Sequence, residues 1–139
     1  MPSRARLLTV LALLIPVALA TQLYEGPGVA WVRAYAGALC YEIFWLFALK
    51  ALLPQVGIFP LAAGVFLVTS ALELLQLSHD PRLGWVRSFA LGRALIGNAF
   101  DPWDIAYYAV GSAMGVLLYR QLTPDIRSGM ASKSSPAKP

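Results

Sequence analysis

The chain has 139 residues, enough for one domain, and it is 58% hydrophobic but only 13% charged. A soluble domain carries about 25% charged residues, so this chain cannot cover a water-exposed surface with polar groups, and we expect lipid to surround it. The net charge of +4 does not indicate a nucleic-acid partner, because the basic residues lie at the chain ends and in loops, as orientation signals beside anionic lipid do. The single cysteine, Cys40, excludes an internal disulfide and a cysteine-based zinc site.

Four apolar stretches predict four transmembrane helices. Each is about 17–20 residues long, or roughly 25–30 Å as a helix, which matches the hydrocarbon core of a bilayer. The sequence Gly26-Pro27-Gly28 interrupts the chain after the first stretch, and Pro54 and Gly57 predict a tight turn between the second and third. We therefore predict an all-α polytopic membrane protein with one domain over residues 1–127, spans at about 7–23, 34–53, 58–77 and 103–122, and a disordered cytoplasmic tail over 128–139.

The first apolar stretch has two interpretations. Arg4 and Arg6 precede it, and Ala18-Leu19-Ala20 lies near its end, a pattern that is also typical of a secretory signal peptide. We expect a retained helix, because the apolar run is long and no soluble domain follows it. A cleaved signal peptide over residues 1–20 is the alternative, and it leaves the other spans unchanged.

Basic residues predict the orientation. With four spans, seven lysines and arginines fall on the side of the chain ends and four arginines on the other side. Because cytoplasmic segments carry the excess of basic residues, we predict that both termini are cytoplasmic. The outer side then holds Arg33, Arg82, Arg87 and Arg93. Pairing with nearby carboxylates, or a bound anionic group, would explain why these arginines do not invert the topology.

The loop from Ser78 to Asp101 predicts a further short helix. Trp85, Phe89, Gly92 and Ile96 recur at the spacing of one helix face. We expect this helix to lie in or against the outer membrane interface, with its apolar face toward lipid or the bundle. Gly97 and Asn98 are expected to end it.

The polar residues of the spans gather in the outer half of the predicted bundle. In the third span, Thr69, Glu73, Gln76 and Asp80 share one helix face. In the fourth, Asp104, either Tyr107 or Tyr108, Gly111 and Gly115 do the same. Glu42 lies somewhat deeper, in the second span.

Each of these residues has a structural interpretation. Asp101 and Asp104 flank Pro102 in a helix-capping arrangement. Glu73 would pair with one of the loop arginines, and Gln76 would hydrogen-bond a neighbouring helix. Glu42 would be buried in its protonated form, because removing a carboxylate from water is costly, and it is the carboxylate that we would least readily assign to a site. Two glycines, Gly111 and Gly115, form a small-residue motif that packs helices, either within the bundle or between the two copies of a homodimer.

The functional interpretation makes one pocket of Glu73, Gln76, Arg87, Arg93, Asp104 and Tyr107. The planar fork of arginine fits phosphate and carboxylate groups, so an outward-facing pocket of this kind suits an anionic lipid headgroup or a lipid-linked envelope precursor. No catalytic triad, phosphate-binding glycine loop or metal motif is present in the sequence, and His79 has no ligand spacing, so we expect neither a cofactor nor a metal. The leading hypothesis is a non-enzymatic envelope or lipid-binding protein. A structural or assembly subunit is one alternative, and a small membrane enzyme or transporter that uses Glu73 is the other.

Several residues of these predicted spans and the loop between them also match the pattern of a known family. The set comprises Glu73, Gln76, Leu91-Gly92-Arg93, Gly97, Phe100, Asp104, Tyr107, Gly111 and Gly115. It resembles an uncharacterised family of small bacterial integral membrane proteins, a domain of unknown function whose members are sometimes labelled ribosomal maturation YjgA family proteins. The pattern is also similar to the VanZ-like proteins, which are associated with glycopeptide resistance. The resemblance implies four spans in a bacterial inner membrane and supplies no activity. Ala38 stands where the family pattern has an acidic residue, so no role is carried over there, and a chain this apolar offers no basic surface for RNA.

Overall fold

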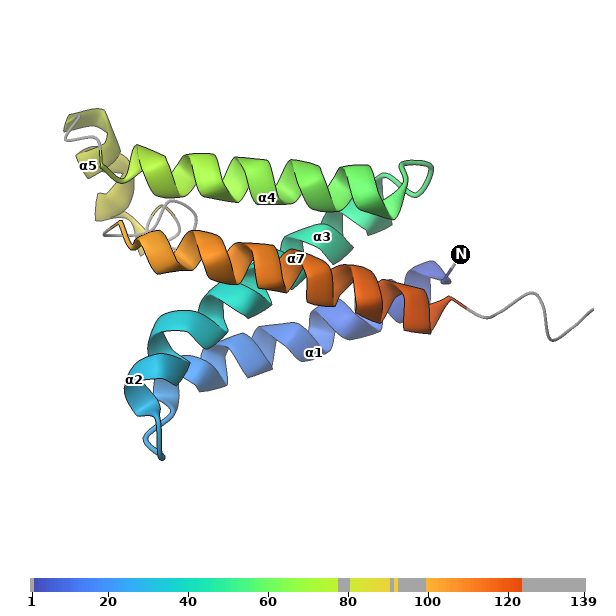
Figure 1. Ribbon diagram of the computed structural model, residues 1–139, viewed down its shortest axis with the longest axis horizontal. Helices are drawn as coiled ribbons and strands as arrows, with labels where there is room; N and C mark the ends of the chain where they lie inside the picture. Colours follow the sequence, from blue (N-terminus) through green and yellow to red (C-terminus); the bar gives the residue numbers. More distant parts are fainter. Residues whose placement is uncertain (1, 78–80, 91, 93–99, 124–139) are drawn as a thin grey trace, which may run out of the picture.

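The computed structural model describes residues 2–77, 81–90, 92 and 100–123, and every regular element in these ranges is a helix (Figure 1). The prediction of an all-α fold is therefore confirmed. In chain order the elements are α1 (Arg4–Leu23), α2 (Val29–Trp31), the π-helical segment η1 (Val32–Ala36), α3 (Gly37–Leu52), α4 (Ile58–Leu75), α5 (Pro81–Ser88) and α7 (Pro102–Leu122).

The second long helix begins earlier than predicted. Elements α2, η1 and α3 follow one another directly and form one run of 24 residues, Val29–Leu52. The run starts after Gly28, whose φ of 72° lies in the left-handed region that glycine adopts without strain. The helix therefore extends ahead of the predicted span, which starts at about residue 34 where the apolar stretch begins, because the Gly28 turn lets the helix begin at Val29, before Arg33.

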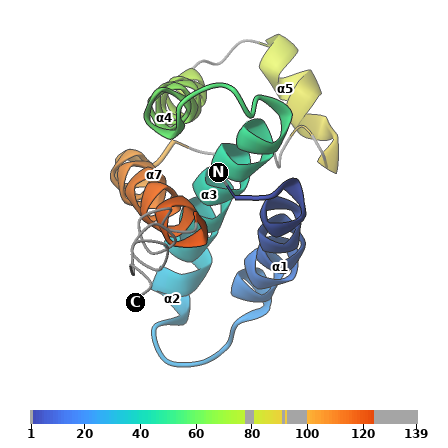
Figure 2. The same ribbon diagram turned by 90° about the vertical axis from the view of Figure 1, so that its right-hand side faces the viewer.

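Helix α3 forms the centre of the bundle and packs against α1, α4 and α7 (Figure 2). Leu46 and Phe47, which are adjacent on α3, are both fully buried. Leu46 packs in a cluster with Leu61 of α4 and Val116 of α7, whereas Phe47 belongs to a second cluster that includes Tyr119 and α1. The core is thus a central helix held on three sides by apolar side chains.

The outside of this bundle is apolar, as lipid contact requires. Large apolar side chains such as Leu13 of α1, Leu67 of α4 and Leu117 of α7 are exposed. Three helical runs are long and apolar enough to cross a membrane, namely Arg4–Leu23, Val29–Leu52 and Ile58–Leu75. At least these three helical runs are therefore compatible with insertion into a membrane. Helix α7 has 21 residues and ends at Leu122, as predicted, but it is less apolar and is not one of the three.

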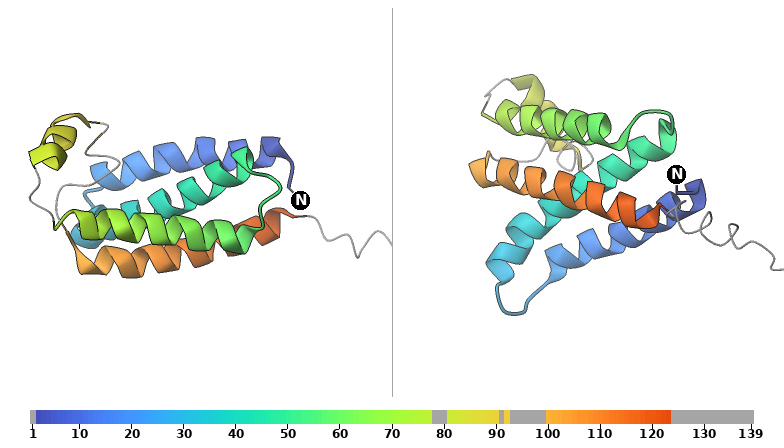
Figure 3. Two further views of the ribbon diagram at one scale, coloured as in Figure 1. Left: turned by 90° about the horizontal axis from the view of Figure 1, so that it is seen from above. Right: turned by 45° about the vertical axis from the view of Figure 1, so that its right-hand side comes forward.

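The two ends of the bundle differ in what they hold. The start of α1 lies beside the end of α7, where the Arg6 Nη1 group donates a hydrogen bond of 3.0 Å to the carbonyl oxygen of Leu122. Helices α2 and α5 and the start of α7 lie at the opposite end (Figures 1 and 3). Glu73, near the end of α4, and Asp104, in the first turn of α7, also lie at this second end, whereas Asp80 lies outside the described residues.

The loop helix is shorter than predicted. Helix α5 ends at Ser88, so a single helix from Trp85 to Ile96 is wrong. The helix is interrupted at Phe89, and a Cβ atom on Gly92 would collide with the carbonyl oxygen of Val86. Ile96, Gly97 and Asn98 lie outside the described residues, as does the predicted tail, and the interfacial location of α5 stays a prediction.

Candidate functional site

Glu73 is the centre of a polar cluster where α4 meets the start of α7. Its side chain is 1% exposed. Oε1 accepts a hydrogen bond of 2.8 Å from the backbone N–H of Asp101, and Oε2 accepts bonds of 2.6 Å from Gln76 Nε2 and 3.3 Å from the hydroxyl of Tyr108. A buried carboxylate needs such donors to offset the loss of water. Glu73 therefore joins the end of α4 to the beginning of α7.

Asp101 caps α7, as the sequence predicts. Its Oδ1 atom accepts a hydrogen bond of 2.9 Å from the backbone N–H of Trp103, and Pro102 occupies the first helical position. Its Oδ2 atom accepts a bond of 3.4 Å from the hydroxyl of Tyr35 in η1. Asp104 lies in the first turn of α7, near enough to Glu73 and Asp101 for the three charges to interact. The positive end of the α7 dipole favours carboxylates at these positions.

Tyr107 and Tyr108 point to different neighbours. Tyr108 contacts Glu73, whereas Tyr107 stacks on Tyr35 with a ring-centroid distance of 4.4 Å. The Tyr107 hydroxyl also accepts a hydrogen bond of 2.7 Å from Trp31 Nε1. Tyr107 therefore belongs to an aromatic group that fixes α2 and η1 against α7, and Tyr108 occupies the place beside Glu73 that the predicted pocket gave to Tyr107.

The arginines of the predicted pocket are only partly described. Arg87 lies in the last turn of α5, half-buried, with its Nε and Nη2 atoms enclosed by protein. Arg93 lies outside the described residues. The structure thus brings together Glu73, Gln76 and Asp104, places Arg87 in α5, and gives Tyr107 to the neighbouring aromatic group.

A second polar group lies one helical turn deeper, between α3, α4 and α7. Glu42 is fully buried, and its Oε1 atom accepts a hydrogen bond of 2.6 Å from the hydroxyl of Ser112. Thr69 is also buried, and its hydroxyl lies next to the Glu42 carboxyl. Ser112 was missed in the sequence, although its spacing of four residues from Tyr108 was a signal that could have identified it.

The two predicted packing glycines face α3 of the same chain. A Cβ atom on Gly111 would lie 2.8 Å from the Cβ of Glu42, and one on Gly115 would lie 2.8 Å from a terminal methyl of Leu46. Small residues allow two backbones to approach closely in a membrane bundle. Here that approach presses α7 against the buried Glu42.

A groove runs along the bundle between α3 and α4. It has a volume of about 620 Å³ and is almost entirely apolar, with a lining that includes Tyr41, Trp45, Gly64, Val68 and Leu72. A Cβ atom on Gly64 would meet nothing within 4 Å, so this glycine opens the groove. Its volume lies in the range of small-molecule binding sites.

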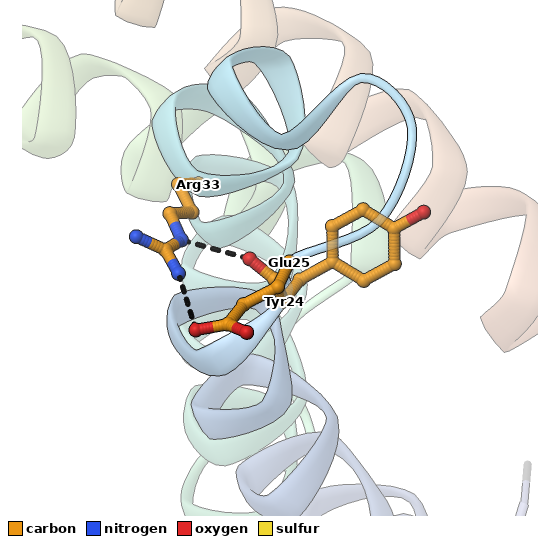
Figure 4. Close-up of polar contacts among 3 residues, drawn as sticks. All are labelled: Tyr24, Glu25 and Arg33. Atoms are coloured by element: carbon orange, nitrogen blue, oxygen red, sulfur yellow. Dashed lines mark hydrogen bonds and ion pairs between the residues drawn. The ribbon is translucent and has the colours of Figure 1, made fainter.

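The loop between α1 and α2 holds an ion pair (Figure 4). Arg33 Nη2 lies 3.9 Å from Glu25 Oε1, and Arg33 Nε donates a hydrogen bond of 2.9 Å to the carbonyl oxygen of Tyr24. Both charged side chains are exposed, so the pair stabilises the fold little. The local pairing expected of the outer-side arginines is therefore present for Arg33.

The chemistry open to the cluster is that of carboxylates and hydroxyls. Within residues 2–77, 81–90, 92 and 100–123, no group of three or more histidine, cysteine, aspartate or glutamate side chains is placed to hold a metal ion, and His79 lies outside these ranges. Carboxylates in this arrangement can accept hydrogen bonds, bind a proton or balance a cation.

The comparison with known families gives one match. Residues 28–112, more than half of the chain, match the family described as "Protein of unknown function (DUF2809)", and the chain belongs to this family. No curated protein and no solved structure gives a significant match. The expected membership in an uncharacterised family is therefore confirmed, while the similarity to VanZ-like proteins and the bacterial origin stay predictions.

Proposed function

We propose that this member of the DUF2809 family is a four-span protein of the bacterial inner membrane, with both termini cytoplasmic, that binds an anionic lipid through its outer end. The fourth span would be α7. Its 21 residues are long enough to cross a bilayer, and Val110, Met114 and Leu117 are exposed on it as lipid-facing side chains. The hydrogen bond between Arg6 and Leu122 keeps the start of α1 and the end of α7 at one end of the bundle, as an even number of spans requires.

The observation that carries the lipid proposal is the groove between α3 and α4. From Pro60 to Leu72 it follows α4 over about 18 Å at the rise of an α-helix. An extended, apolar groove on a surface that faces lipid is suited to an acyl chain. Its outer end lies near the end of α4, where Glu73 is located.

Arginines near this end of the groove are suited to bind the anionic headgroup of the lipid. Helix α5 follows α4 and carries Arg82 and Arg87; in the end-on view it lies on the side away from α7 (Figure 2). A guanidinium binds phosphate through two parallel hydrogen bonds. The ligand class is therefore a phosphate or carboxylate headgroup on a long apolar chain, which describes both an anionic membrane lipid and a lipid-linked envelope precursor.

Native mass spectrometry of the protein extracted with its lipids tests this proposal. Wild type is expected to retain an anionic lipid, whose mass distinguishes a membrane lipid from a lipid-linked precursor. Gly64→Leu fills the groove and should abolish retention. Ala63→Leu is the matched control, because Ala63 lines the separate groove between α4 and α7 and should leave retention unchanged.

Two results would overturn the lipid proposal. One is a wild-type protein that retains no anionic lipid when reconstituted with an equal mixture of anionic and zwitterionic lipids. The other is equal retention by Gly64→Leu and Ala63→Leu. Arg87→Gln tests the headgroup separately, since it should lower the preference for anionic over zwitterionic lipid without emptying the groove.

Two other functions have less support. A structural or assembly subunit would use Gly111 and Gly115 against a partner helix, but both glycines face α3 of the same chain. An enzyme or transporter that uses Glu73 would need this carboxylate to react, whereas its three hydrogen bonds favour an organising role.

A further inference from the structure

Polar side chains on α7 continue inward from the outer cluster. Asp104, Tyr108 and Ser112 follow one another at intervals of four residues, which places them on one face of the helix. The Tyr108 hydroxyl donates to Glu73, and the Ser112 hydroxyl donates to Glu42. The face therefore presents one hydroxyl to each of two buried carboxyl groups, and the two hydroxyl-bearing residues are about 6 Å apart along the helix axis.

Glu42 has a hydrogen-bonding arrangement that differs from that of Glu73. Its side chain is fully buried, and only Oε1 has a hydrogen-bond donor, Ser112; Oε2 has no hydrogen-bond partner among the described residues. The neighbouring hydroxyl of Thr69 has a single hydrogen, which it directs at the carbonyl oxygens of Val65 and Phe66, at 3.0 and 3.1 Å. Thr69 can therefore accept a hydrogen bond from Glu42, but it cannot donate one while it contacts its own helix.

These neighbours offer a hydrogen-bond partner to each oxygen of the protonated Glu42 side chain, but they leave one oxygen of the ionised side chain without a donor. In the protonated form, the Oε2–H group of Glu42 has the neighbouring Thr69 oxygen as a potential acceptor, and Ser112 donates to Oε1. In the ionised form, a negative charge lies inside an apolar bundle with one donor for two oxygens. Such a charge is costly at membrane depth, and ionisable residues there mark proton or ion pathways.

The groups that face Glu42 contribute no positive charge. Helix α4 contributes Thr69 and, one turn outward, Glu73; α7 contributes Ser112 and, one turn outward, Tyr108; α3 itself contributes Tyr41. Helix α1 carries only Arg4 and Arg6 as charged residues, and these lie near the end of α7, far from the polar cluster.

We infer that Glu42 is a proton-binding site within the bundle, and that it exchanges its proton with Asp104, the half-buried carboxylate in the first turn of α7, along the Tyr108–Ser112 face of that helix. On release, the proton leaves Oε2 of Glu42 and is taken up by the Asp104 carboxylate, which passes it to water at the end of the bundle. Glu42 becomes an anion, and rebinding the proton restores the neutral acid. No other reactant takes part.

Infrared difference spectroscopy of the protein in lipid vesicles tests this inference. Spectra recorded over a series of pH values are expected to contain a protonated-carboxyl band that Glu42→Gln removes and that disappears as the pH is raised. Ser112→Ala should shift this band, because it removes the hydrogen bond to Oε1. Tyr108→Phe should leave the band in place at equilibrium but slow its disappearance at least severalfold after a pH jump, an effect that a purely structural residue would not have.

The alternative outcomes are distinct. No Glu42 band at any pH would show that the residue is always ionised, and a Glu42 band that never changes with pH would show that its proton does not exchange. Either result overturns the inference. If Glu42→Gln does not fold, the band shift in Ser112→Ala assigns the band instead, and a wild-type spectrum with no pH-dependent protonated-carboxyl band still overturns it. Lipid retention in the Gly64→Leu experiment is a separate measurement, so the two proposals fail independently.

Discussion

A pair of glycine substitutions offers the most direct test of the packing between α3 and α7. A Cβ atom on Gly111 would lie 2.8 Å from the Cβ of Glu42 and 3.2 Å from the carbonyl oxygen of Leu39. Both atoms belong to or adjoin the α3 backbone, so neither can move without moving the helix. A Cβ atom on Gly64 would meet nothing within 4 Å.

The magnitude follows from comparing the two variants. Replacing glycine by alanine inside a helix gains about 1 kcal/mol from helix propensity, and this gain is common to Gly64→Ala and Gly111→Ala. Overpacking costs about 1–3 kcal/mol, and it applies only at Gly111. Gly64→Ala should therefore stabilise the protein by up to about 1 kcal/mol, and Gly111→Ala should be less stable than Gly64→Ala by about 1–3 kcal/mol.

Reversible unfolding in mixed detergent micelles, followed by circular dichroism, measures the difference. Gly115→Ala should fall between the other two variants, because its nearest neighbour is the flexible end of Leu46. Equal stabilities for Gly64→Ala and Gly111→Ala, or a Gly111→Ala that is the more stable of the two, would refute the close approach of α7 to α3.

Substitutions at three further residues test polar contacts of the bundle, each by thermal unfolding. Glu73→Ala should destabilise the protein by about 1–3 kcal/mol, because it leaves the Asp101 N–H and the Tyr108 hydroxyl without their acceptor, and an unchanged melting temperature would argue against the cluster. Asp101→Ala should cost about 1 kcal/mol through the lost cap of α7, and Asp101→Asn, which can still cap, should cost less. Lys50 is buried, and its Nζ donates to the carbonyl oxygens of Pro54 and Val56. Lys50→Met should therefore destabilise the α3–α4 turn by about 1–3 kcal/mol, and a Lys50→Met protein as stable as wild type would show that these two bonds contribute nothing.

Features that depend on local sequence were predicted correctly. The apolar runs placed α1, α4 and α7 within a few residues of their observed bounds, since a helix of this length and composition is favoured by its own residues in lipid. The cap formed by Asp101 and Pro102 was also predicted, because its donor lies only two residues along the chain. The extent of the loop helix was predicted wrongly, because α5 ends at Ser88 and Gly92 lies against Val86, a contact that the periodic pattern does not specify.

What the sequence determined by itself is the membrane class of the protein, its helical elements and the end of the bundle that holds its polar residues. The tertiary structure decided which of these residues meet. Tyr107 and Tyr108 are adjacent in sequence, yet the rotation of α7 turns Tyr108 toward Glu73 and Tyr107 toward Tyr35. Glu42 is the carboxylate that the sequence least readily assigns to a site, but the close approach at Gly111 encloses it beside Ser112. Helix rotation and helix approach are set by packing between elements far apart in the chain, and no local pattern of residues specifies them.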